Sequence, residues 1–296
     1  MKNIILFLSI LTSGHAQSAI YGEDERQLAY ETPIYQEYSR SVLSQIRDGS
    51  LILEQEDYFL KTKSLNEHVG NLCEDTPFKD VPTFSRCSAF LISDDLMVTA
   101  GHCINNHDEC LKAVWVFSDE IDPRDPKPRI LKQDIVKCDK IVSRIKNPIS
   151  KNDYALIKLT SKVSHRPHLK FRTSGRIENE DRLLVLGHPT GLPLTISDNN
   201  KILENSSDFL FKINSDTFGG NSGSPVINLR TGLVEGILTD GDLDYILDSE
   251  RKCKTTFKCR DNQCRGENVV RITNIPELVP NMTPVEPIFD PRLPRL

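Results

Sequence analysis

The chain has 296 residues, of which 38% are apolar and 27% are charged, and its formal net charge at pH 7 is -5. This composition is typical of a soluble globular protein, and the length allows one large domain or two small ones. Because the net charge is weakly acidic and the basic residues are scattered, the sequence excludes a strongly basic nucleic-acid surface and a polybasic membrane patch.

Residues 1–19 show the order of features that is typical of a secretory signal peptide. Lys2 precedes an apolar run over residues 4–11, and small residues follow, with cleavage expected after Ala16 or Ala19. The apolar run is too short to cross a bilayer as a helix, and no later stretch is long enough. We therefore expect a secreted or periplasmic protein that has no membrane span and is a monomer.

Two further segments differ from the middle of the chain. Residues 20–72 are charged and rich in helix formers, which favours an N-terminal extension, either a pro-segment or an arm packed on the main domain. Residues 280–296 form a proline-rich tail that we expect to be extended and poorly ordered. Residues 73–279 remain as the predicted functional domain.

Short β-like runs separated by Gly, Pro, Asn and Asp dominate this domain. They lie at residues 88–93, 113–117, 154–159, 183–186, 209–213, 233–238 and 269–272. Regularly spaced short strands with turn residues between them predict an all-β sandwich or barrel fold.

The chain has eight cysteines, an even number, which in an exported protein predicts disulfide bonds. They are Cys73, Cys87, Cys103, Cys110, Cys138, Cys253, Cys259 and Cys264. None forms the close C-x-x-C pair of a zinc site. The acidic run at residues 240–244 departs from the EF-hand calcium loop, because Tyr245 stands where glycine is required. We expect neither a metal nor another cofactor.

Three motifs carry residues suited to acyl transfer: TAGHC at 99–103, NDYALI at 152–157 and GGNSGSPV at 219–226. A serine hydroxyl needs a neighbouring imidazole as base, and the imidazole needs a carboxylate that fixes its tautomer. His102, Asp153 and Ser222 are the predicted triad. Glycines beside the serine let the chain turn sharply, so the main-chain N–H groups of Gly220 and Ser222 are the expected oxyanion donors.

Other residues of the same types fit these roles less well. His188 lies in a Gly-His-Pro turn, and Ser224 precedes a proline and lacks a following glycine. Asp125, Asp134 and Asp139 are not followed at once by an uninterrupted apolar strand, as Asp153 is.

The three motifs, in the order His, Asp, Ser, resemble the chymotrypsin-like serine peptidases, most of all the bacterial glutamyl endopeptidase and V8-type branch. The resemblance covers roughly residues 85–275 and implies two six-stranded antiparallel β-barrels with the active site between them. It also implies a Cys87–Cys103 disulfide, whereas the pairing of the other six cysteines stays open. Asn221 stands where many animal relatives carry the aspartate that pairs with a new N-terminal amine. We therefore expect the oxyanion loop to form without that ion pair.

The resemblance further implies that Asp216, Thr217, Leu238, Thr239 and Asp240 bind substrate. Leu238 occupies the position where glutamate-cleaving members carry a histidine, and a leucine cannot donate a hydrogen bond to a carboxylate. Asp216 corresponds to the acid that holds Arg or Lys in trypsin-type members, although some glutamate-cleaving relatives share it. The residue preference therefore stays open, with a basic residue favoured.

The sequence thus predicts a secreted serine endopeptidase that acts on proteins or peptides. Two alternative hypotheses remain for the function. One is a catalytically silent member of the fold that serves as a secreted binding module, and the other is an esterase that uses the same triad.

Overall fold

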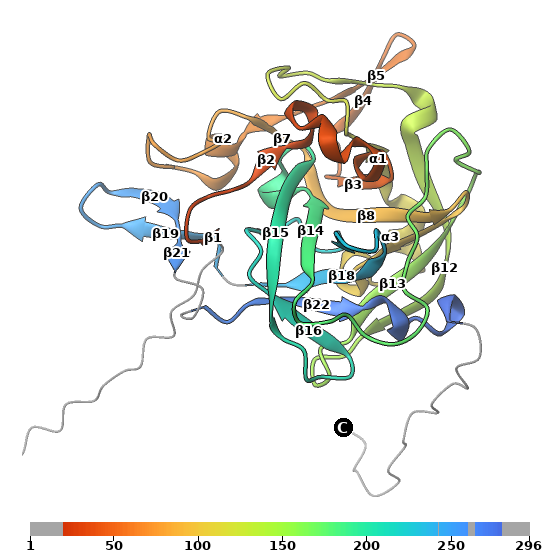
Figure 1. Ribbon diagram of the computed structural model, residues 1–296. Coiled ribbons are helices and arrows are strands. Elements are labelled where there is room, and N and C mark those ends of the chain that lie inside the picture. Colours follow the sequence, from red (N-terminus) through yellow and green to blue (C-terminus); the bar gives the residue numbers. More distant parts are fainter. Residues whose placement is uncertain (1–19, 242, 260–263, 280–296) are drawn as a thin grey trace, which may run out of the picture.

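The computed structural model describes residues 20–241, 243–259 and 264–279, and two β-barrels dominate this part of the chain (Figure 1). The predicted signal peptide, the proline-rich tail and Asp242 lie outside the described residues. The strands of the first barrel are β3 (Val42–Ile46), β8 (Ser85–Ser93), β9 (Leu96–Thr99), β10 (Val114–Phe117), β12 (Ile135–Lys146) and β13 (Asp153–Leu159). This barrel closes because β3 pairs with both β8 and β10.

The second barrel is built from the C-terminal half of the chain. Its strands are β14 (Arg182–Gly187), β15 (Thr195–Glu204), β16 (Leu210–Ile213), β17 (Pro225–Asn228), β18 (Val234–Asp240) and β22 (Glu267–Arg271). It closes because β14 pairs with both β15 and β17, and β2 (Gln27–Leu28) adds to the free side of β15. The predicted all-β fold with two six-stranded antiparallel barrels is confirmed.

Smaller elements surround the barrels. The additional strands are β1 (Ile20–Tyr21), β4 (Leu51–Glu54), β5 (Asp57–Leu60), β6 (Lys63–Ser64), β7 (Pro82–Thr83), β11 (Arg129–Ile130), β19 (Tyr245–Asp248), β20 (Cys253–Thr256) and β21 (Lys258–Cys259). The α-helices are α1 (Gln36–Ser39), α2 (Leu65–Val69) and α3 (His107–Lys112). Within the described residues, no helix combines the length and the apolar character needed to cross a bilayer.

Successive side chains along the barrel strands point alternately into the interior of their own barrel and into the apolar core between the two barrels. In β8, Ala89 and Leu91 pack inside the first barrel, whereas the intervening Phe90 joins the cluster between the barrels. In β14, Val185 packs inside the second barrel, and its neighbour Leu184 joins the same inter-barrel cluster. Because both faces of these strands are buried, the middle of each sequence is a continuous apolar run, at residues 89–92 in β8 and 183–186 in β14. The shared core fixes the two barrels against each other.

The segment 20–72, expected to be an extension, contributes to both barrels. β3 supplies a strand of the first barrel, as described above, and β2 lengthens the sheet of the second. The side chain of Arg26 lies over the rings of Phe78 and Phe218, with its guanidinium carbon 5.2 and 4.1 Å from the ring centres. The predicted boundary at residue 73 therefore separates strands that pair with each other.

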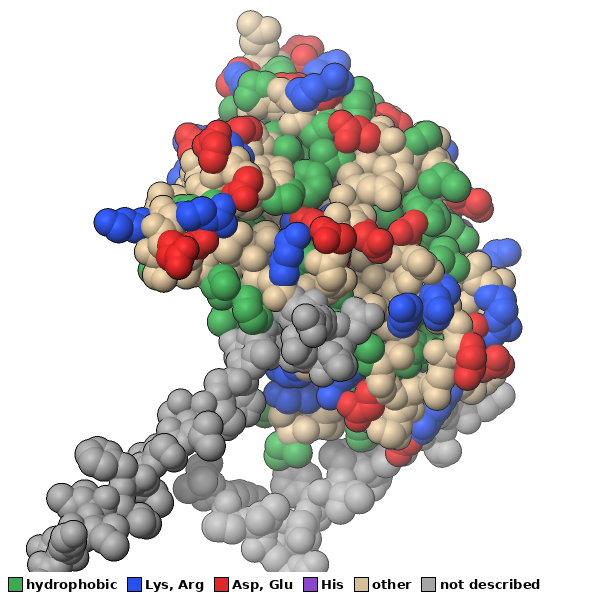
Figure 2. All heavy atoms as spheres, turned by 60° about the vertical axis from the view of Figure 1, so that its left-hand side comes forward, with side chains coloured by type: hydrophobic (Ala, Val, Ile, Leu, Met, Phe, Trp, Pro, Cys, Tyr) green, Lys and Arg blue, Asp and Glu red, His purple; other side chains and the backbone are tan. Residues whose placement is uncertain are grey.

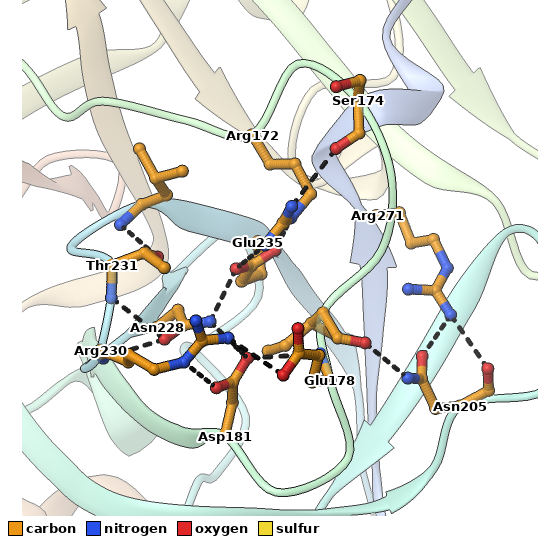
Figure 3. A network of polar contacts seen from close by, with 12 residues as sticks. Arg172, Ser174, Glu178, Asp181, Asn205, Asn228, Arg230, Thr231, Glu235 and Arg271 are labelled. Carbon is orange, nitrogen blue, oxygen red and sulfur yellow. Dashed lines mark hydrogen bonds and ion pairs between the residues drawn. The ribbon is translucent and has the colours of Figure 1, made fainter.

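A polar network holds the segment between the barrels to the second barrel (Figure 3). The carboxylate of Glu235 in β18 accepts hydrogen bonds from Arg172, at 2.8 Å to Nη2, and from Asn228, at 2.9 Å. Asn228 also donates a hydrogen bond to the carboxylate of Asp181 at 2.8 Å, and Arg230 donates to the other oxygen of the Asp181 carboxylate at 2.7 Å. Glu235 and Asp181 are buried, so these contacts compensate the cost of removing two charges from water.

The β19–β20 hairpin projects from the second barrel (Figure 1) and is fastened at its turn, where Asp248 pairs with Cys253. Cys253 in β20 forms a disulfide with Cys73, which lies 180 residues earlier. Arg251 pairs with Asp248 in the hairpin at 2.7 Å and with Asp75 at 2.8 Å. Over this side of the molecule acidic and basic side chains are interspersed (Figure 2). The hairpin is thus fixed beside the chain that follows α2.

Candidate active site

A cavity of about 570 Å³ is lined by both barrels. His102 and Asp153 reach it from the first barrel, and Ser222 and Thr239 reach it from the second. The structure therefore brings the three predicted triad residues to one cleft, although they lie far apart in the sequence.

His102 and Asp153 meet because their strands are neighbours. β9 and β13 are paired, with Thr99 opposite Ala155, so the turn after β9 lies beside the start of β13. Asp153 holds His102 at two points: Oδ2 lies 2.7 Å from Nδ1, and Oδ1 accepts the main-chain N–H at 2.9 Å. Gly101 has no space for a Cβ, which would collide with Asp153 and with the carbonyl of Ile145. The close approach therefore requires glycine before the histidine.

Ser222 lies in the loop that precedes β17, and this loop is bound to the first barrel. The N–H of Ser88 in β8 donates to the carbonyl of Ser222 at 2.8 Å. Gly223 has a φ of +93°, and a Cβ there would collide with the carbonyl of Ser88, so only glycine fits. The hydroxyl of Ser222 donates to the carbonyl of Thr239 at 3.4 Å. Ser222 is thus positioned at the junction of the two barrels.

The backbone of this loop presents two N–H donors. Within the described residues, the N–H groups of Gly220 and Ser222 have no hydrogen-bond acceptor. The carbonyl of Gly220 accepts from the Ser88 hydroxyl at 3.0 Å, and the N–H of Asn221 donates to the carbonyl of Phe218 at 3.0 Å. Both contacts hold the peptide plane between Gly220 and Asn221, and the N–H of Thr190 holds the preceding plane by donating to the carbonyl of Gly219 at 2.5 Å. The N–H groups of Gly220 and Ser222 are thus left as donors for an oxyanion.

His188 supports the same loop from behind and does not line the cleft. Its Nδ1 lies 3.1 Å from the hydroxyl of Ser88, and its Nε2 lies 2.7 Å from the hydroxyl of Ser118. Complete burial lowers the pKa of His188 to about 3, so its ring is neutral at physiological pH. The rival serine, Ser224, is also fully buried and contacts Asn221 at 3.4 Å.

Among the residues predicted to bind substrate, four line the cavity: Thr217, Leu238, Thr239 and Asp240. Asp216 does not. Its carboxylate accepts the N–H groups of Tyr21 at 2.8 Å and of Glu25 at 3.1 Å. Burial raises the pKa of Asp216 to about 6, although the two N–H donors oppose this shift.

Sequence reasoning missed two acidic residues that line the cavity, Asp244 and Glu267. Asp244 is the last residue of the acidic run at residues 240–244, so composition pointed to its neighbourhood. Glu267 belongs to no motif. Its only signal is that it lies two residues before the apolar run that begins at Val269, at the start of β22, a position from which a side chain can point into a barrel-end cavity.

The cysteines near His102 offer no metal site. Cys87, Cys103 and His102 form a group with ligand-like spacing. The sulfurs of Cys87 and Cys103 are, however, joined in a disulfide and cannot act as thiolate ligands. A third disulfide joins Cys110 in α3 to Cys138 in β12.

Comparison with solved structures gives matches at low identity. The VesB protease of Vibrio cholerae is 14% identical with a TM-score of 0.49, covering 85% of this chain and 65% of the VesB chain. The chain thus spans about two thirds of that structure's length. A Glu endopeptidase is 14% identical with a TM-score of 0.46, covering 82% and 95% of the two chains. The active form of the Rv3671c protease of M. tuberculosis is 14% identical with a TM-score of 0.43, covering 86% and 88%.

No curated protein sequence matches the chain. A family model, that of the trypsin-like peptidase domain, matches residues 87–237, which include all three predicted triad residues. This match spans half of the chain and agrees with the two-barrel fold and with the resemblance of the three motifs. The chain therefore belongs to the family of trypsin-like peptidase domains.

Proposed function

We propose that the protein is a secreted serine endopeptidase with His102, Asp153 and Ser222 as its catalytic triad. The observation that carries the proposal is the two-point contact between His102 and Asp153 in the cavity that Ser222 also lines. With Nδ1–H donating to Asp153, the imidazole presents Nε2 as the proton acceptor.

In the proposed reaction, Ser222 attacks the carbonyl carbon of the scissile peptide bond while Nε2 of His102 takes the hydroxyl proton. The Ser222 hydroxyl first leaves the Thr239 carbonyl, a weak contact at 3.4 Å. The N–H groups of Gly220 and Ser222 stabilise the oxyanion, and His102 returns its proton to the leaving amine. Water then hydrolyses the acyl-enzyme with His102 again as base.

The substrate backbone is expected to add as a strand beside Leu238, Thr239 and Asp240 at the end of β18. This mode of binding distinguishes a peptidase from an esterase, which needs no extended contact along the acyl chain. Protein or peptide substrates are therefore favoured over small esters.

We propose further that residues 20–72 remain in the mature enzyme. Removing β3 would leave β8 and β10 of the first barrel without their shared partner and expose two strand edges. Mass spectrometry of the secreted protein checks this. The expected mature chain begins close to residue 20, whereas an active enzyme that begins near residue 73 would contradict the proposal.

The catalytic proposal is tested with a fluorophosphonate probe and a mixed peptide library. The native protein should be labelled and should cleave peptides, and Ser222→Ala should do neither. Ser224→Ala is the matched control, since it removes the neighbouring hydroxyl and should keep the label. If neither labelling nor cleavage occurs in the native protein, the hypothesis of a secreted binding module replaces that of a serine endopeptidase. Cleavage of esters without peptides would favour the esterase.

A further inference from the structure

The loop that carries Ser222 packs directly against the turn that follows β14. Asn221 is a neutral amide, so an ion pair with an N-terminal amine cannot hold this loop. Gly187, at the end of β14, has no space for a Cβ, which would collide with Oδ1 of Asn221. A Cβ on Gly220 would collide with the carbonyl of His188. The contacts across this junction are therefore the ones that can fix the loop.

The hydroxyl of Ser88 makes three contacts at this junction and has one proton. It donates that proton to the carbonyl of Gly220 at 3.0 Å, because a carbonyl can only accept. The main-chain N–H of His188 donates to the same hydroxyl at 3.1 Å, and Nδ1 of the His188 ring lies 3.1 Å from it. Since the proton of Ser88 is already used, its oxygen can only accept from the ring. Nδ1 of His188 must therefore carry a proton.

The other ring nitrogen of His188 is the acceptor. Nε2 lies 2.7 Å from the hydroxyl of Ser118, which is 2% exposed. His188 itself is 0% exposed, and within the described residues its ring has no hydrogen bond to a carboxylate that would compensate a positive charge. Nε2 is thus unprotonated and accepts from Ser118. The neutral Nδ1–H tautomer is the form that satisfies both hydroxyl contacts.

The main chain of the same turn holds the preceding peptide of the loop. Thr190 has a φ of +50°, in the left-handed region that a β-branched residue rarely adopts. In this conformation its N–H donates to the carbonyl of Gly219 at 2.5 Å, while the N–H of Gly191 donates to the carbonyl of His188 at 3.0 Å and closes the turn. The carbonyl of Gly219 and the N–H of Gly220 belong to one planar peptide. The Thr190 contact therefore sets the direction of the Gly220 N–H.

We propose that His188, as the neutral Nδ1–H tautomer, is a positioning residue for catalysis that acts through Ser88 to hold the oxyanion loop. The inference rests on the proposed function. The ring directs the Ser88 hydroxyl at the carbonyl of Gly220, and the turn behind the ring holds the carbonyl of Gly219. The two N–H donors of the loop are thereby set before substrate binds, which is what stabilisation of an oxyanion requires. Losing these contacts weakens binding of the transition state more than binding of the substrate.

The test measures kcat and KM separately for a peptide that the native enzyme cleaves, beside the rate of fluorophosphonate labelling. Ser88→Ala removes the hydroxyl and keeps the main-chain N–H that binds the carbonyl of Ser222. It should lower kcat about 100-fold and change KM by less than about threefold, and the labelling rate should fall in parallel. His188→Asn keeps an N–H donor toward Ser88 and should retain more activity than His188→Phe, which keeps none.

The matched control is Ser41→Ala. Ser41 is 0% exposed, its hydroxyl donates to the carbonyl of Pro167 at 2.9 Å, and it does not line the cavity. This variant loses the same kind of buried hydrogen bond as Ser88→Ala, and its kcat should equal that of the native enzyme.

NMR of native protein that carries isotope-labelled histidine tests the tautomer without reference to activity. At neutral pH the His188 ring, identified by the loss of its signals in His188→Asn, should carry a proton on Nδ1 and none on Nε2. A proton on Nε2 would refute the inference.

Fluorophosphonate labelling of the native protein separates the possible failures. If the native protein is not labelled, the proposed function fails and the inference about catalysis fails with it. If the native protein is labelled and cleaves peptides, a kcat of Ser88→Ala within about threefold of the native value refutes the inference alone. Equal losses in Ser88→Ala and Ser41→Ala, or in His188→Asn and His188→Phe, would also refute it, because a general loss of stability would then explain the effect.

Discussion

Ionisation of Asp244 at neutral pH is expected to destabilise the folded protein. Asp244 lies at the cavity, where its Oδ2 accepts the N–H of Gly219 at 3.0 Å. Burial raises the pKa of this carboxyl group to about 6, although the hydrogen bond from Gly219 and the charge of Arg26 oppose the shift. The folded state therefore keeps this proton to a higher pH than the unfolded state.

The direction of the pH effect follows from proton binding. Because the folded state binds more protons between about pH 4 and pH 6, stability falls as the pH rises through this range. The pKa rises from 3.8 to about 6, and a shift of about two units corresponds to ~3 kcal/mol of unfolding free energy. Asp244→Asn retains an oxygen acceptor for Gly219 and removes the ionisation. The variant should exceed the native protein in stability by ~3 kcal/mol at pH 7 and by little below pH 4.

Urea unfolding of native protein and Asp244→Asn between pH 4 and pH 7.5, with the disulfides intact, measures this difference. The m-values should agree, so that the midpoints report stability. Glu56→Gln is the control, because Glu56 is exposed in the β4–β5 turn, and this variant should follow the native curve at every pH. A difference between Asp244→Asn and the native protein that does not change with pH would refute the reasoning.

Three further substitutions test the triad, the polar network and the long-range disulfide. Asp153→Asn should lower kcat about 10⁴-fold, since an amide cannot hold the productive tautomer of the imidazole, and a tenfold loss or less would contradict this role. Asn228→Ala should lower the unfolding free energy by ~3 kcal/mol, because two hydrogen bonds to buried carboxylates are lost. Urea unfolding measures this effect, and a loss below ~1 kcal/mol would count against the network. Replacing Cys73 and Cys253 together by alanine opens a loop of 180 residues and should cost up to ~5 kcal/mol in the same assay.

The sequence was sufficient for the fold class because its signals are local. The alternation and spacing of short apolar runs predicted an all-β protein, and the motifs around His102 and Ser222 pointed to two six-stranded barrels by resemblance. The glycines at 101 and 223 are visible in the sequence, and the structure supplies their reason: each is in contact with backbone of another segment. The triad itself stays a prediction until Ser222 and its partners are tested.

Other features were decided only by contacts between distant segments. The sequence favoured Asp216 as the specificity acid, whereas in the structure its carboxylate binds Tyr21 and Glu25, almost 200 residues away. Glu267 reaches the cavity through the pairing of β22 with β16 and β18, for which the sequence has no local signal. The partner of Cys253 and the place of β3 in the first barrel have the same origin. Residue type and local spacing determine which chemistry and which strands are available, but strand register and barrel closure decide which side chains meet.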